Sequence, residues 1–120
     1  MRPFYLALLG GFAAPVLALA GEADVVGVKF IKSGNGTYNF SVTVEHADEG
    51  WDHFANKWEV VAPDGTTLGV RKLAHPHVEE QPITRSQSGI KIPEGVKEVI
   101  VRAHDSVHGF GGKEMRVVVE

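Results

Sequence analysis

The chain contains no cysteine among its 120 residues. This absence excludes disulfide bridges, a cysteine nucleophile, zinc–thiolate sites and the thiolate ligand of a blue-copper centre within the chain. A domain of this length must therefore be stabilised by its apolar core alone. Histidine, with six residues, is left as the abundant nitrogen ligand for a metal ion.

Basic residues are also scarce. Twelve lysines and arginines stand against 15 acidic residues, which gives a formal net charge of −3. Nucleic acids and anionic membrane surfaces are bound through clustered lysine and arginine, and the sequence has no such cluster. We therefore expect no nucleic-acid partner.

A long uncharged run occurs only at the start of the chain. Arg2 precedes an apolar stretch over residues 4–20, which ends on Ala18-Leu19-Ala20, a small-x-small pattern that signal peptidase accepts. The stretch is shorter than the roughly 20 residues of a membrane-spanning helix. We expect residues 1–20 to be a cleaved secretory signal peptide and residues 21–120 to form one periplasmic or extracellular domain without a membrane span.

Helical periodicity is missing after residue 20, because no stretch of about 11 residues keeps an apolar stripe at 3.6-residue spacing. Apolar and polar residues instead alternate with period two, and turns such as Pro63-Asp64-Gly65 separate the runs. Residues 48–56 have room for one helical turn, and Gly89 predicts a bulge. The pattern predicts an all-β, seven-stranded antiparallel β-sandwich with strands near residues 26–30, 37–45, 57–62, 67–73, 83–92, 99–103 and 115–119.

The last third of the chain carries a resemblance to a known family. The alternating run over residues 97–105 leads into Gly109-Phe110-Gly111-Gly112 and a final strand, and Ile90-x-Ile92-Pro93 comes before it. This arrangement resembles the final hairpin of a fibronectin type III domain, although valine stands where that family has its corner tyrosine. The resemblance implies an immunoglobulin-like sandwich and no particular activity.

All six histidines are expected at one end of this sandwich. Successive antiparallel strands run in opposite directions, so their connections alternate between the two ends. Three connections at the same end carry two histidines each, namely His46 with His53, His75 with His77, and His104 with His108.

The spacing of these histidines predicts a transition-metal site. In His75-Pro76-His77, residues i and i+2 of an extended segment share a face and lie about 6.6 Å apart. Imidazole and carboxylate without thiolate favour zinc or copper(II). The expected ligands are His75, His77, His104, His108 and Asp105, with His53, Asp52 and His46 as further candidates. Glu80 and Arg85 are expected to fix the loop or to orient the imidazoles.

Other functions remain open on the same residues. A non-catalytic module that binds a protein, peptide or glycan would use Trp51, Phe54 and Phe110. A pH sensor would use the histidines without a metal. Catalysis is not expected, because the sequence has no serine elbow, phosphate loop or cysteine, but a hydrolytic metal centre with three protein ligands and a water fits the same pattern.

Overall fold

The structure is a computed structural model that describes residues 21–120, so the expected signal peptide lies outside the described residues. Within this range the regular elements are strands and one 3-10 turn, η2 (Gly34–Gly36), and no helix is long and apolar enough to cross a membrane. The strands are β1 (Asp24–Lys32), β2 (Thr37–Glu45), β3 (Ala55–Val61), β4 (Thr67–Lys72), β5 (Ile83–Lys91), β6 (Glu98–Asp105), β7 (Gly109–Phe110) and β8 (Met115–Val118).

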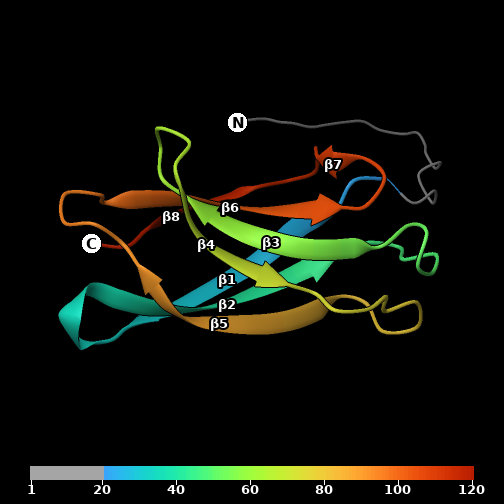
Figure 1. Ribbon diagram of the computed structural model, residues 1–120, viewed down its shortest axis with the longest axis horizontal. Coiled ribbons are helices and arrows are strands. Elements are labelled where there is room, and N and C mark those ends of the chain that lie inside the picture. Colours follow the sequence, from blue (N-terminus) through green and yellow to red (C-terminus); the bar gives the residue numbers. More distant parts are fainter. Residues whose placement is uncertain (1–20) are drawn as a thin grey trace, which may run out of the picture.

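The strands form two antiparallel sheets that lie one over the other (Figure 1). One sheet has the order β1-β2-β5, and the other has the order β4-β3-β6, with β7 and β8 both paired to β6. The β7 strand pairs with the end of β6 and β8 with its beginning. The all-β prediction is confirmed. The prediction of seven strands missed β7, because two residues are too few to show alternation.

The core lies between the two sheets and follows the alternation of the sequence. Phe40, Val42 and Val44 of β2 are buried while their neighbours are more exposed, and Trp58 and Val60 of β3 face them from the other sheet. Each large apolar side chain that is fully buried contributes about 1.5–3 kcal/mol. This packing stabilises the described domain, which contains no disulfide.

Two local predictions can be compared directly with the backbone. Gly89 has a φ of 72°, and the β2–β5 register shifts beside it, so the predicted bulge is confirmed. Residues 48–56, where the sequence has room for one helical turn, instead form a loop that enters β3 at Ala55. The backbone N–H of Glu49 donates to the carbonyl of His53 at 2.8 Å, so the loop closes on itself without a helix.

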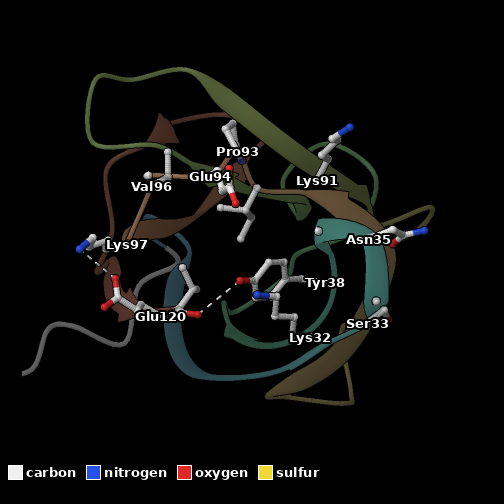
Figure 2. Close-up of a pocket in the computed structure, with 15 residues that line it drawn as sticks. Lys32, Ser33, Asn35, Tyr38, Lys91, Pro93, Glu94, Val96, Lys97 and Glu120 are labelled. Carbon is white, nitrogen blue, oxygen red and sulfur yellow. Dashed lines mark hydrogen bonds and ion pairs between the residues drawn. The ribbon is translucent and has the colours of Figure 1, made fainter.

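The connections at one end of the sandwich carry five of the six histidines, and His104 lies in β6 next to its last residue, at the same end, as the strand directions predict. The loops after β2, β4 and β6 extend together beyond the same end of the sheets (Figure 1). The other end has a hollow of about 700 Å³, lined by residues that include Tyr38, Glu94 and Lys97 (Figure 2). Tyr38 there donates to the carbonyl of Val119 at 3.3 Å, and no histidine lines the hollow. The histidine chemistry is therefore separate from this hollow.

Candidate metal centre

Three imidazole rings converge on one oxygen atom of Asp105. Asp105 Oδ2 lies 3.0 Å from His46 Nε2, 3.1 Å from His53 Nε2 and 2.9 Å from His108 Nδ1. The rings of His46 and His53 have centroids 4.8 Å apart, and those of His53 and His108 are 5.0 Å apart. The four side chains therefore form one compact group at the loop end of the sandwich.

The strand register explains how distant residues meet. Ala55 of β3 pairs with Asp105 of β6, so His53, two residues before Ala55, reaches the end of β6. His46 follows β2 of the facing sheet and continues its buried face, two positions after Val44. His108 lies in the tight connection from β6 to β7. The site thus joins both sheets where the core ends.

Asp105 is fixed through its other oxygen. Its Oδ1 accepts hydrogen bonds from the backbone N–H groups of Val107 at 2.6 Å and His108 at 2.7 Å. Burial alone would raise the pKa of Asp105, but the hydrogen bonds from His108, Val107 and His53 hold it well below its usual range. Asp105 is therefore a carboxylate with Oδ2 turned toward the imidazoles.

Two further carboxylates contact the outer nitrogens of the rings. Asp48 Oδ1 lies 2.6 Å from His46 Nδ1, and Glu49 Oε1 lies 2.7 Å from His53 Nδ1. Burial lowers the pKa of His53, but the hydrogen bonds to Glu49 and Asp105 outweigh it, so that this pKa is raised above its ordinary value. A histidine that binds a metal commonly donates its second ring N–H to such a carboxylate.

The buried group of His46, His53 and Asp105 can hold a metal ion. One ligand atom from each residue lies within 4.8 Å of the others, and the structure brings together no other such group of three among residues 21–120. The carbonyl oxygen of Gly21 also lies 2.9 Å from His46 Nε2, at hydrogen-bond distance. His108 contacts the same carboxylate oxygen but lies outside this group, because its ring nitrogens do not come within 4.8 Å of the ligand atoms of both other imidazoles.

The structure brings together only some of the expected ligands. His108 and Asp105, two of the five expected ligands, lie beside His46 and His53, which were further candidates. His104 is not in this group, because it alternates with Asp105 along β6 and faces the opposite side of the sheet. There it contacts Asn56 at 2.7 Å, and burial together with nearby Lys57 lowers its pKa.

His75 and His77 lie beside each other but outside this group. Their ring centroids are 4.8 Å apart. His77 Nε2 accepts a hydrogen bond from the guanidinium of Arg85 at 3.1 Å, and burial followed by that charge lowers the pKa of His77. Because the Arg85 guanidinium is cationic and occupies this nitrogen, the pair is poorly suited to bind a metal cation. The two rings thus lie on one side of the segment, as the i,i+2 spacing predicts, but Arg85 occupies the His77 nitrogen that a metal ion would need.

The remaining predicted residues have other surroundings. Arg85 lies 3.9 Å from Glu80, in agreement with a loop-fixing role, and Asp52 is exposed.

The aromatic residues of the recognition alternative have different neighbours. Trp51 is 69% exposed and meets Phe54 edge to face, with centroids 5.7 Å apart. Phe110 packs under Arg102, 4.0 Å from its guanidinium carbon, so it belongs to the outer face of the sheet.

The sequence pattern predicts no role for Asp48, which is buried and lies at the centre of the loops. Besides contacting His46, it accepts hydrogen bonds from the backbone N–H groups of Ala55 at 3.0 Å and His77 at 2.7 Å. Its position two residues after His46, at the end of a strand, is the only signal in the sequence, and this signal is common in solvent-exposed loops.

The fold and the site together define a small two-sheet β-protein with a buried histidine–aspartate cluster. No family model and no solved structure matches the chain. The chain is similar to a protein of Halomicrobium mukohataei named "Putative lipoprotein", with 44% identity over 99 residues. The match covers 82% of this chain and 48% of that protein, so the chain spans about half the length of this relative.

Proposed function

We propose that this protein is an exported transition-metal-binding protein that acts as a carrier, buffer or sensor. The observation that carries the proposal is the convergence of three imidazole nitrogens on Asp105 Oδ2, within 2.9–3.1 Å. The ion would be held by His46, His53 and Asp105, and His108 would join as a fourth ligand by a rotation of its exposed ring.

The hydrogen-bond acceptors around the rings support a cation at this place. A neutral imidazole has one N–H, yet both nitrogens of His46 face carboxylate oxygens, and so do both nitrogens of His53. If the outer nitrogens donate to Asp48 and Glu49, the inner lone pairs point toward the Asp105 carboxylate. A metal ion removes this repulsion by accepting the inner lone pairs and the carboxylate together.

The donor atoms favour zinc or copper(II). Nitrogen and carboxylate oxygen without sulfur suit these ions better than calcium, which takes six to eight oxygen ligands. Three imidazoles and one carboxylate also supply the number of ligands of a tetrahedral zinc site.

An exported location fits the sequence and the comparison. The expected signal peptide over residues 1–20 would place the domain outside the cytoplasm. The similar protein from Halomicrobium mukohataei carries the name "Putative lipoprotein", which also fits an exported protein. A sulfur-free histidine site suits an oxidising compartment, since it has no thiol to oxidise.

Calorimetric titration of the metal-free protein with zinc and with copper(II) tests the proposal. We expect one ion per chain with a Kd well below about 100 μM near pH 7.5. Circular dichroism of the same sample establishes that it is folded. A folded sample that binds neither ion more tightly than this limit would contradict the proposal.

Metal affinity is expected to fall as the pH is lowered. His53 must lose its proton to bind an ion, and its raised pKa keeps a proton bound above pH 6.5. The decline should therefore begin above about pH 6.5, whereas Asp105, with its lowered pKa, stays ionised throughout. Competition with a chelator of known affinity, between about pH 8 and 5.5, measures the effect. A constant affinity over this range would argue against imidazole ligands.

A recognition module is the second candidate, and the exposure of Trp51 favours it. Large aromatic side chains at the surface are frequent anchors in protein interfaces, and Trp51 lies in the loop between the ligands His46 and His53. This function would survive removal of metal by a chelator and would be lost in Trp51→Ala.

A further inference from the structure

We propose that His108 is the exchangeable ligand of the site, through which the ion enters, leaves and meets an external ligand. This inference rests on the proposed metal-binding function. It assigns unequal roles to the three imidazoles.

The first support is the difference in how the rings are held. The His46 side chain is fully buried and contacts Asp48 at 2.6 Å, and the His53 side chain is 11% exposed and contacts Glu49 at 2.7 Å. Both rings are therefore fixed through their outer nitrogens. His108 is 37% exposed, and Asp105 is the only hydrogen-bond partner of its ring among residues 21–120. Its outer nitrogen has no carboxylate to hold it.

The second support is the rigid backbone beneath this ring. Asp105 Oδ1 accepts the backbone N–H groups of Val107 and His108, so the turn is fixed independently of the imidazole. Gly112 follows against the backbone of Ala23, where an added Cβ would lie only 2.1 Å from the Ala23 carbonyl oxygen. The segment after the turn, at Gly112, is thus packed closely. The His108 ring can therefore rotate while the backbone of the loop stays in place.

The third support is the group that remains when His108 turns away. His46, His53 and Asp105 still offer three ligand atoms within 4.8 Å of one another. An ion held by three protein ligands with one free position accepts a water or an external donor there, as sites with an open position do. An external imidazole or a similar nitrogen donor would enter from the exposed side of His108.

Exchange kinetics of the zinc-loaded protein test this role. We expect His108→Ala to bind one zinc ion with affinity reduced about 10- to 100-fold, and to release it to excess chelator at least about ten times faster. Added imidazole should restore much of the affinity of His108→Ala. It should not restore His53→Ala, because the position of His53 is largely closed to solvent. Copper(II) electron paramagnetic resonance provides a second readout, since the nitrogen signal lost in His108→Ala should return with imidazole.

The outcomes separate this inference from the proposed function. If the wild-type protein binds no zinc or copper(II), both fail. If it binds, an unchanged affinity and release rate in His108→Ala would show that His108 is not a ligand. Complete loss of binding in folded His108→Ala and His108→Gln, without rescue by imidazole, would show that His108 is as essential as the buried rings. Either result overturns the inference.

Discussion

Replacing His53 by alanine is expected to weaken zinc and copper(II) binding by more than about 100-fold. Loss of a partner that only orients a ligand already costs about 10- to 100-fold in affinity, so loss of the ligand itself costs at least as much. A 100-fold change corresponds to about 2.7 kcal/mol of binding free energy. His53 Nε2 lies 3.1 Å from Asp105 Oδ2, and its ring stands between those of His46 and His108, which makes it the central imidazole of the group.

His75→Ala is the matched control for this change. It removes the same side chain at the same end of the sandwich, but His75 is exposed, and among the described residues its ring has one hydrogen-bond partner, the carbonyl of Pro76, at 3.3 Å. We expect its Kd to stay within about twofold of the wild-type value. Calorimetry on both variants, with circular dichroism to establish folding, measures the difference. Equal losses in the two variants, or a larger loss in His75→Ala, would place the ion at the His75–His77 pair.

The sheets could be predicted from the sequence because the alternation of apolar and polar residues follows the alternation of buried and exposed side chains along each strand. Phe40, Val42 and Val44 alternate with polar residues and are all fully buried between the sheets. The Gly89 bulge could be predicted for a similar reason, since glycine readily adopts the positive φ that it has there. The two-residue β7 is held by pairing with the end of β6, which is a long-range interaction that no local pattern reports.

The end of the sandwich that carries the histidines could be predicted, but the grouping of the side chains could not be fully resolved. The alternation of side chains along a strand favours His46 as a member of the group, because His46 continues the buried face of β2. The same alternation disfavours His104, because it points to the opposite face of β6 from Asp105. Local spacing favoured His75 and His77. Their surroundings depend on Arg85, which reaches His77 from β5 and is a neighbour that spacing alone does not reveal.

Replacing Asp48 by alanine is expected to lower the free energy of unfolding by about 3–5 kcal/mol. The Asp48 side chain is fully buried and its two oxygens accept hydrogen bonds from His46, Ala55 and His77, which belong to three different segments of the chain. Alanine would leave two buried backbone N–H groups and one imidazole nitrogen without a partner, and each such group is costly. The same change frees the outer nitrogen of His46, so metal affinity should also fall, by about 10- to 100-fold.

Asp52→Ala is the control in the same loop, because Asp52 is exposed and its loss should change stability by no more than about 0.5 kcal/mol. Urea denaturation of the metal-free proteins, with equal slopes, gives the comparison. Asp48→Asn separates charge from shape, since the amide keeps one acceptor oxygen but loses the negative charge beside His46. A metal-free Asp48→Ala protein as stable as Asp52→Ala would show that water satisfies the three donors, and that Asp48 holds neither the loops nor the His46 ring in place.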